Sequence, residues 1–304
     1  MQALRDACAA VARRARHVEV VEAEIPEYAA DLRDLSPAAA SDSGAHLTTG
    51  TREQLAAFWI TLNAINFGSG WFPTLHKRDG RSGYFTIATG VRERFERAGP
   101  WSAAELRTIS AAELASALGQ DPDHELMELF ARSLRDLGTR VAAEFGGCFA
   151  AVADAARGSA VQLAELVGGW TCFADSSRYE ELTVPFLKRA QLLAADLARA
   201  GVEEFRDLDR LTMFADNLVP HVLRIDGVLR FEPALIARIE LEQLIEHGSR
   251  EEVEIRACAL HAVELLVAAG RGRSAADVDQ LLWNRGQEPR YKRRPRHRSR
   301  CTAY

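Results

Sequence analysis

Apolar residues recur at intervals of three and four positions along most of the chain, which places them on one face of an α-helix. This pattern predicts a mainly α fold. We expect helices at 51–66, 123–145, 184–200, 233–247, 251–269 and 274–284. Two stretches rich in β-branched residues, 17–25 and 84–88, predict short strands.

Several residue types that begin or end helices support these ranges. Ser102 with Glu105, and Ser110 with Glu113, have the spacing of capping boxes at helix starts. Gly119 follows the second of these helices, and a glycine at such a position commonly ends a helix. Three more glycines are expected to end helices: Gly201, Gly248 and Gly270.

Two segments rich in glycine predict loops. Residues 36–50 form a loop that carries His46, and residues 66–84 combine glycines with aromatic side chains. Loops of this length in a compact domain tend to be functional. No repeat or linker divides the sequence, so we expect one domain over 1–304.

Charge is distributed unevenly along the chain. With 304 residues, 47% of them hydrophobic, the chain can build a sizeable core. The net charge of −5 divides into −12 for residues 1–284 and +7 for residues 285–304. An acidic body repels a phosphate backbone, so we expect a small-molecule substrate and no duplex nucleic acid.

Cysteine spacing and missing motifs exclude several classes of protein. The five cysteines are scattered and form no CxxC pair, which predicts neither a disulfide framework nor a zinc site. Phosphate-loop, GxGxxG, GxSxG and HExxH motifs are absent, so we expect no metal and no cofactor. No apolar run reaches the roughly 18 residues of a membrane span. We expect a cytoplasmic monomer with no membrane partner.

Asp216 is a charged residue within the apolar run LTMFADNLVPHVL. An aspartate before such a run, with Pro220 in the first turn, is typical of a helix N-cap, and we favour this role on sequence alone. A capping aspartate can also serve in catalysis, because a carboxylate fixed at a helix start stays ionised and oriented. Such a group can stabilise a developing cation.

Only three of the 38 basic residues are lysines, and one of them lies in an apolar helical segment. Lys188 has Val184 and Leu192 one turn to either side. A lysine in this position usually extends to solvent, although a lysine retained in an arginine-rich chain favours a functional role. Both interpretations stay open.

Other polar and aromatic residues have ordinary structural explanations. Asp279 and Trp283 share a helix face, while Asp277 and Asp279 face different ways, and a solvated surface is the simplest account of both aspartates. Histidines 46, 221 and 261 are more often hydrogen-bonded than ligands. The aromatic residues are core candidates, although a planar base needs such faces for stacking: Phe67, Trp71, Phe72, Tyr84 and Phe214.

Several runs together resemble the queuosine salvage protein family, whose members are queuosine 5′-phosphate N-glycosylases. They occur in the same order over most of the chain: NFGSGW at 66–71, RSGY at 81–84, FLKRAQLLAAD at 186–196, TMFAD at 212–216, REEVEIRACALHAVELL at 250–266, DQLLW at 279–283 and HRSRCTAY at 297–304. The resemblance implies a helical fold similar to helix-hairpin-helix DNA glycosylases. It implies hydrolysis of queuosine 5′-monophosphate with release of queuine for tRNA modification.

The resemblance also assigns roles to residues. Asp216 matches the catalytic aspartate, as nucleophile or transition-state stabiliser, and Lys188 would serve the same pocket. The expected base-binding residues are Phe214, His46 and Asp279, with Asn284 where the family pattern predicts a second acid. A 5′-phosphate would be bound by Lys188 or by arginines near the C-terminus, Arg298 and Arg300.

Two alternatives concern the basic segment and the substrate. Residues 285–304 are typical of an RNA-binding tail, which would make the protein a non-catalytic helical RNA-binding module. The segment ends in Cys301 and Tyr304, which favours its docking on the body. A glycosylase for another modified nucleotide is the other alternative.

Overall fold

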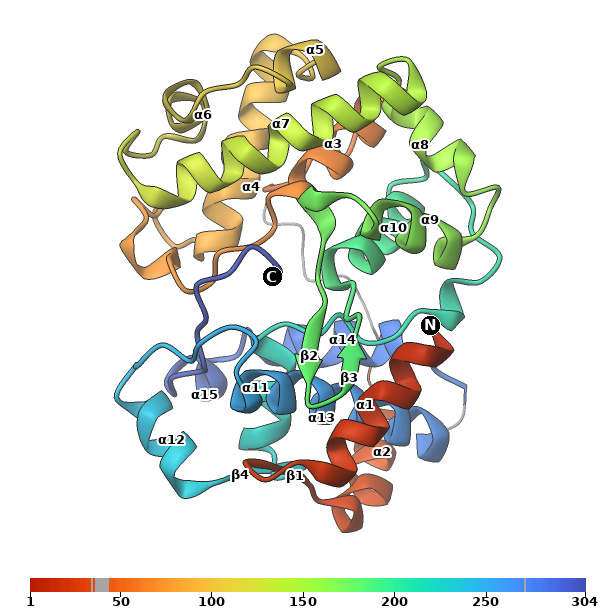
Figure 1. The fold of residues 1–304 in the computed structure, drawn as a ribbon, viewed down its shortest axis with the longest axis vertical. Coiled ribbons are helices and arrows are strands. Elements are labelled where there is room, and N and C mark those ends of the chain that lie inside the picture. Colours follow the sequence, from red (N-terminus) through yellow and green to blue (C-terminus); the bar gives the residue numbers. More distant parts are fainter. Residues whose placement is uncertain (34, 36–43, 271) are drawn as a thin grey trace. The chain divides into compact units, whose positions relative to one another are not determined.

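The computed structural model describes residues 1–33, 35, 44–270 and 272–304, and most of these lie in helices (Figure 1). The mainly α fold expected from the sequence is confirmed. The α-helices are α1 (Gln2–Arg14), α2 (Ile25–Arg33), α3 (Arg52–Ala64), α4 (Gly83–Ala98), α5 (Ala103–Leu106), α6 (Ala111–Leu118), α7 (Glu125–Phe145), α8 (Phe149–Ala155), α9 (Ala160–Gly168), α10 (Lys188–Arg199), α11 (Leu218–Ile225), α12 (Pro233–Glu240), α13 (Arg250–Gly270), α14 (Ala275–Arg285) and α15 (Pro289–Lys292). The strands are β1 (Val18–Val20), β2 (Ser177–Tyr179), β3 (Leu182–Val184) and β4 (Leu229–Phe231).

The helix starts agree well with the capping residues in the sequence. The side chains of Ser102 and Ser110 cap α5 and α6 as reciprocal capping boxes, and Gly119 ends α6 with a left-handed backbone. Of the other glycines, Gly201 follows α10 with positive φ. Gly248 instead precedes α13, and Gly270 is the last residue of α13.

Three expectations about local structure are wrong. The helix expected at 233–247 ends at Glu240, as α12, and Glu242 beyond it has φ +54°, outside the range of a right-handed helix. Residues 84–88 belong to α4, whose N-cap Ser82 accepts the amide hydrogen of Phe85, so the helix start overrides the β-branched composition. The helix expected at 184–200 begins only at Lys188, because residues 182–184 form β3. The strand expected at 17–25 is confirmed in part, as β1.

The chain separates into two compact units, each made of several segments. The first unit comprises Met1–Ser41, Ser176–Lys188 and Leu208–Cys301, and the second comprises Asp42–Asp175, Arg189–Asp207 and Thr302–Tyr304. None of the helices within the described ranges is long and apolar enough to cross a membrane.

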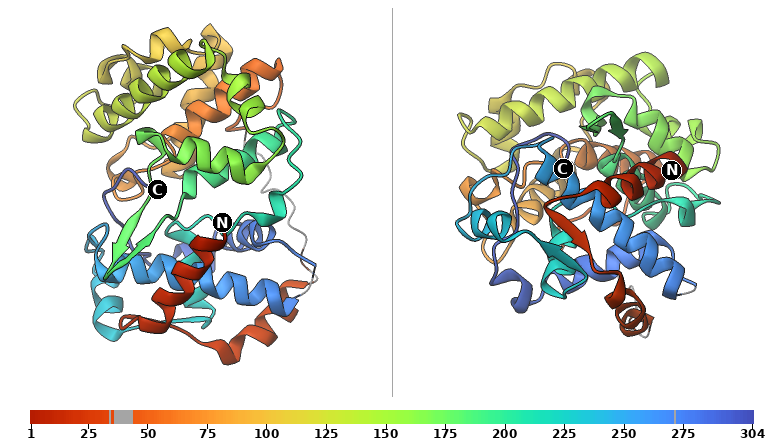
Figure 2. Two further views of the ribbon diagram at one scale, coloured as in Figure 1. Left: turned by 45° about the vertical axis from the view of Figure 1, so that its right-hand side comes forward. Right: turned by 60° about the horizontal axis from the view of Figure 1, so that its bottom comes forward.

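The first unit is built around α13. Side chains from all sides of this helix are buried, and α1, α2, α11 and α14 pack against it (Figure 1). Two antiparallel strand pairs complete the unit. Val18 pairs with Phe231 in β1–β4, and Ser177 pairs with Val184 in β2–β3. Figure 2 shows β1, in red, beside β4, in cyan, although more than 200 residues separate them in sequence.

The second unit is built around α7, against which α3, α5, α6 and α8 pack. Gly138 allows the closest of these contacts, because a Cβ atom there would lie 2.7 Å from the Ala103 carbonyl oxygen. Any larger residue would therefore push α5 away from α7.

The last three residues of the chain are held within the second unit by Arg189. This buried guanidinium donates to the carbonyl oxygens of Ala303 (3.1 Å) and Thr302 (2.7 Å), and to those of Cys172, Ala64 and Asn63. The amide of Gly68 donates to Tyr304 O at 3.0 Å. Gly68 has φ +101°, which favours glycine.

Replacing Arg189 therefore removes the donors for several buried carbonyl groups at once. We expect Arg189→Met to lower the free energy of unfolding by about 3 kcal/mol or more, since each unsatisfied buried acceptor is costly. Urea denaturation followed by circular dichroism measures this. The exposed Arg97→Met is the matched control, with an expected change within about 0.5 kcal/mol. A similar small change for Arg189→Met would contradict the anchoring role.

Candidate active site

The candidate catalytic residue lies in an irregular segment of the first unit, where residues 211–217 connect the short helix Leu208–Arg210 to α11. Every residue of 211–217 is buried except Asp216, which is half-buried. A single carboxylate therefore reaches the surface of an otherwise apolar segment. Because the segment is not helical, other parts of the unit must satisfy its backbone groups.

Asp216 contacts the start of α11. Its Oδ1 accepts the amide hydrogen of Leu218 at 2.7 Å, while Asn217 is the residue at the N-cap position. The expected N-cap role of Asp216 is therefore shifted by one residue. Pro220 lies in the first turn, as expected. Among the described residues, none donates a hydrogen bond to Oδ2, so one carboxylate oxygen remains available.

The carbonyl of Ala215, directly before Asp216, is held by a buried arginine. Arg256 Nε donates to Ala215 O at 2.9 Å, and its guanidinium stacks 3.9 Å from the ring centre of Phe186. Arg256 also lies 3.5 Å from Glu252. Burial raises the pKa of Glu252, but the charges of Arg256 and His247 outweigh burial and bring it to about 2. Glu252 is thus ionised and balances the buried Arg256.

Two of the expected site residues meet directly. Asp279 of α14 accepts the amide hydrogen of Phe214 through Oδ1 at 3.0 Å, and both residues are buried. Asp279 therefore fixes the backbone two residues before Asp216. The solvated-surface explanation for Asp279 is wrong, because only 6% of the residue is exposed.

Asn284 and Lys188 also lie in the first unit. Asn284, at the end of α14, is half-buried and accepts a hydrogen bond from Gln280 at 2.9 Å. Lys188 is the first residue of α10 and is 5% exposed, so it does not extend to solvent. Leu187 before it has φ +52°, an uncommon backbone conformation for leucine.

His46 belongs to the second unit. Its Nε2 lies 2.9 Å from the hydroxyl of Tyr84, and its ring centre lies 4.9 Å from that of Trp59. The ring of Phe85 is also nearby, at 6.2 Å. His46 is therefore surrounded by aromatic side chains and oriented by a hydrogen bond. The earlier part of its loop, residues 36–43, lies outside the described residues.

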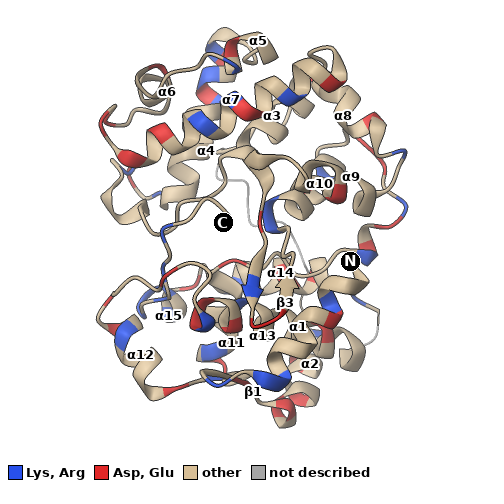
Figure 3. Cartoon of the chain, viewed as in Figure 1, with Lys and Arg blue, Asp and Glu red and all other residues tan. Residues whose placement is uncertain are grey.

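Side chains of α11 bind the backbone of the C-terminal segment. Asn217, His221 and Arg224 lie at helical spacing, and they donate to the carbonyl oxygens of His297 (3.0 Å), Tyr291 (3.0 Å) and Pro295 (3.1 Å) respectively. The C-terminal segment is therefore bound to the helix that begins two residues after Asp216. The segment is strongly basic, as the blue ribbon beyond α15 shows (Figure 3).

One cation of this segment, Arg296, interacts electrostatically with Asp216, and the sequence did not single it out. Burial lowers the pKa of Arg296, and the carboxylate of Asp216 opposes that shift. Arg296 is half-buried and precedes His297, whose carbonyl is bound by Asn217. The basic run has eight cations, and the interaction with Asp216, a tertiary property that the sequence does not reveal, distinguishes Arg296 among them.

The model of one protein family, described as queuosine salvage protein, matches residues 45–304. The chain belongs to the queuosine salvage protein family. Two relatives illustrate the similarity. A queuosine 5′-phosphate N-glycosylase/hydrolase of Sphaerobacter thermophilus is 35% identical over 266 residues, covering 83% of this chain and 82% of that protein. The protein of that name from Bos taurus is 30% identical over 245 residues, covering 73% and 72%.

Several runs that carry the queuosine salvage resemblance have visible structural roles. NFGSGW supplies Gly68, and KRAQ supplies Arg189, both of which hold the chain end. TMFAD contains Phe214 and Asp216, while REEVEIRACALHAVELL contributes Arg256. The motifs thus order irregular backbone as well as carrying candidate chemistry.

The contacts of His221 predict a pH dependence of stability. Nε2 donates to a carbonyl, and Nδ1 lies 3.4 Å from Arg224, so the neutral form fits. Burial lowers the pKa of His221 to about 4. Between pH 6.5 and about 4 the unfolded chain therefore binds more protons at this position, and stability falls as pH falls.

We expect His221→Gln, which keeps a donor for Tyr291, to flatten this dependence. The slope of unfolding free energy against pH between 6.5 and 4 should decrease by up to about 1.4 kcal/mol per pH unit, one proton. Urea titrations at several pH values measure the slope. The exposed His76→Gln is the control. An unchanged slope in His221→Gln would show that His221 charges equally easily in both states.

Proposed function

We propose that this protein hydrolyses the N-glycosidic bond of queuosine 5′-monophosphate and releases queuine. The observation that carries this proposal is the half-buried carboxylate of Asp216, fixed on an ordered but non-helical segment within the TMFAD motif. Curated relatives that cover most of this chain are named for that activity. The enzyme class is an N-glycosidase, and the mechanism below extends that assignment to individual residues.

In our proposal Asp216 stabilises the positive charge that develops on the sugar. Breaking the bond between C1′ and the base nitrogen gives the ribose oxocarbenium character, and carboxylates stabilise such cations in glycoside hydrolysis generally. Oδ1 is oriented by the Leu218 amide, which leaves Oδ2 to face the sugar or to orient water. The N-terminus of α11, which Oδ1 contacts, carries partial positive charge.

The base leaves with its bonding electrons and needs groups that bind it. In our proposal Phe214 stacks on the deazaguanine ring, and Asp279 and Asn284 accept hydrogen bonds from its amino groups. Asp279 already binds the Phe214 amide through Oδ1, so it also positions the aromatic residue. A contact from His46 to the base remains a prediction from the resemblance.

The phosphate requires a cation near the sugar. Lys188 remains the proposed partner from the KRAQ motif, either for the phosphate or for Asp216. Arg296 is a further candidate because its guanidinium interacts electrostatically with Asp216. Arg298 is less available, since it donates to Glu242 O at 3.2 Å and lies 3.5 Å from the Glu242 carboxylate. Arg300 remains a candidate phosphate-binding residue on the basis of the sequence.

Three further aspects of the proposal come from the sequence. We propose that the helical arrangement is related to helix-hairpin-helix glycosylases, that the protein acts as a monomer in the cytoplasm, and that 1–304 functions as one domain. The segment 285–304 would then contribute to the enzyme rather than act as an independent arm. Its carbonyl groups bound by α11 support this.

Replacing Asp216 tests the catalytic assignment. We expect Asp216→Asn to fold normally, because the side chain keeps an oxygen for the Leu218 amide. Release of queuine should fall by several orders of magnitude, since the negative charge is lost. Mass spectrometry of the released base measures the rate. The exposed Asp209→Asn, in the short helix that precedes this segment, should retain full activity. Comparable rates in both variants would return Asp216 to a purely structural role.

Comparing two substrates tests the role of the phosphate. We expect queuosine without its 5′-phosphate to react far more slowly than queuosine 5′-monophosphate, because a phosphate contact orients the sugar against Asp216. Arg296→Gln and Lys188→Gln, each assayed with both substrates, identify the cation. The relevant variant slows the monophosphate towards the rate of the nucleoside. Equal rates for both substrates in the unaltered enzyme would exclude phosphate recognition.

A further inference from the structure

The first unit contains a polar hollow formed by α11, β4, α12 and the segment 290–294. Its volume is about 720 Å³, within the range of small-molecule pockets. Five arginines line it, and Glu240 is the one carboxylate among the described lining residues: Arg224, Arg230, Arg290, Arg293 and Arg294. Asp216, Phe214 and Asp279 are not among the residues that line this hollow.

Two of these arginines are already balanced by acids. Arg290 forms an ion pair with Asp226 at 3.1 Å, and Arg230 forms one with Glu19 at 2.9 Å. Within the described part of the chain, no ion pair engages the other three, Arg224, Arg293 and Arg294. The hollow therefore carries three cations against one exposed carboxylate.

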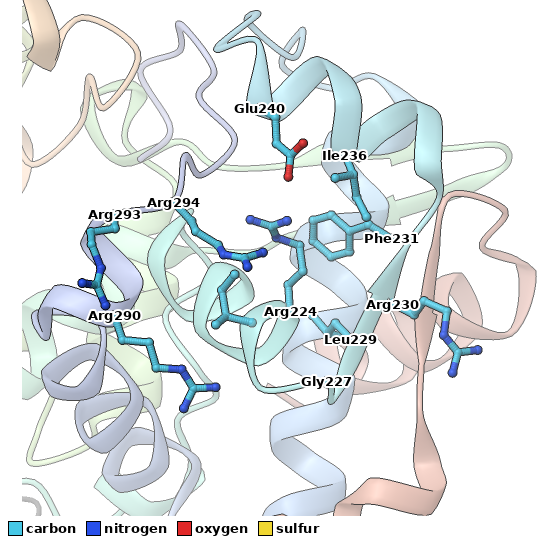
Figure 4. Close-up of a pocket in the computed structure, with 11 residues that line it drawn as sticks. Arg224, Gly227, Leu229, Arg230, Phe231, Ile236, Glu240, Arg290, Arg293 and Arg294 are labelled. Atoms are coloured by element: carbon cyan, nitrogen blue, oxygen red, sulfur yellow. The ribbon is translucent and has the colours of Figure 1, made fainter.

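Two of the three unbalanced cations face one another. In Figure 4 the side chains of Arg224 and Arg294 extend towards each other across the hollow, with the Glu240 carboxylate opposite. Burial lowers the pKa of Arg224, Glu240 raises it, and Arg294 lowers it further. Like charges that line one hollow repel each other, and a bound anion offsets that repulsion.

Arg224 is also held in a fixed orientation before any ligand arrives. Its Nη2 donates to Pro295 O at 3.1 Å, and the guanidinium lies 5.8 Å from the ring centre of Phe231. A fixed guanidinium loses little freedom when it binds an oxyanion, and arginine matches phosphate geometry through paired hydrogen bonds. The walls include the apolar side chains of Leu229, Phe231 and Ile236.

We propose that this hollow binds a small oligophosphate, a molecule with two or more linked phosphate groups. Arg224 and Arg294 hold the phosphates from opposite sides, and Arg293 adds charge at the margin. Three unbalanced cations match an oligophosphate better than a single phosphate group. A concave site also suits a small ligand, whereas the phosphates of RNA need an extended basic surface.

Titration calorimetry with inorganic pyrophosphate, at about 0.15 M salt, tests the proposal. We expect saturable binding to the intact protein. The double variant Arg293→Gln and Arg294→Gln should weaken it by about tenfold or more, since one lost charge-assisted contact is worth about that factor. The matched control replaces two exposed arginines of the second unit, Arg97→Gln and Arg107→Gln, and should bind normally.

A second variant predicts the opposite change. Glu240→Gln removes the one opposing carboxylate, which lies exposed at the last residue of α12, and should strengthen pyrophosphate binding several-fold. Adenosine diphosphate serves as the second ligand. If adenosine diphosphate binds more tightly than pyrophosphate, the apolar wall contacts a nucleoside. If the two ligands bind equally well, the site binds free oligophosphates.

The result does not depend on the proposed hydrolysis, because no turnover is measured. No saturable binding of pyrophosphate would overturn the proposal. Equal pyrophosphate affinities in the Arg293 and Arg294 double variant and in its control would also overturn it. The anion would then bind elsewhere, for example at the candidate active site. Binding of a short single-stranded RNA that needs Arg293 and Arg294, without binding of pyrophosphate, would assign the surface to a polymer instead.

Discussion

Much of the order in irregular parts of this structure depends on buried guanidinium groups that bind backbone carbonyls. A carbonyl outside a helix or sheet, once buried, must find a donor. Arg189 supplies donors to five carbonyl groups in the second unit, and Arg256 supplies one to Ala215 in the first. The planar guanidinium, with five N–H groups, suits this task, and lysine could not reproduce the geometry.

This constraint explains how the carboxylate of Asp216, the proposed catalytic group, can lie outside regular secondary structure and still be held in place. Residues 213–217 are fixed at successive positions: Asp279 binds the Phe214 amide, Arg256 binds the Ala215 carbonyl, and the side chain of Asn217 binds the C-terminal segment. The charge of Arg256 is balanced by Glu252, whose pKa is held at about 2. A buried ion pair of this kind fixes the positions of its groups, while its net contribution to the free energy of unfolding is often small.

The sequence predicted the regular elements better than the site. Helices with a clear apolar stripe, such as α7 and α14, were placed to within a few residues because this signal is local. The prediction of a strand at 84–88 was wrong, because Ser82 caps a helix, α4, that includes these residues. The contact between Asp279 and Phe214 joins residues 65 positions apart, so no periodicity reveals it. The burial of Lys188 is likewise a tertiary property, and local pattern favoured exposure.

The uneven charge of the chain takes on a structural meaning once the partners of the basic segment are known. Asp226 alone accepts hydrogen bonds from Tyr28 and Tyr291 and forms ion pairs with Arg285 and Arg290. Part of the positive charge at 285–304, on Arg285 and Arg290, is therefore opposed by an acid of the same unit. An RNA-binding arm needs cations exposed in series and free to follow a phosphate backbone. Here the backbone of residues 291–298 is bound to α11 and to Ile245. Arg293 and Arg294, for which no ion pair is found within the described residues, line one hollow together with Arg224, which favours a compact anion over a polymer.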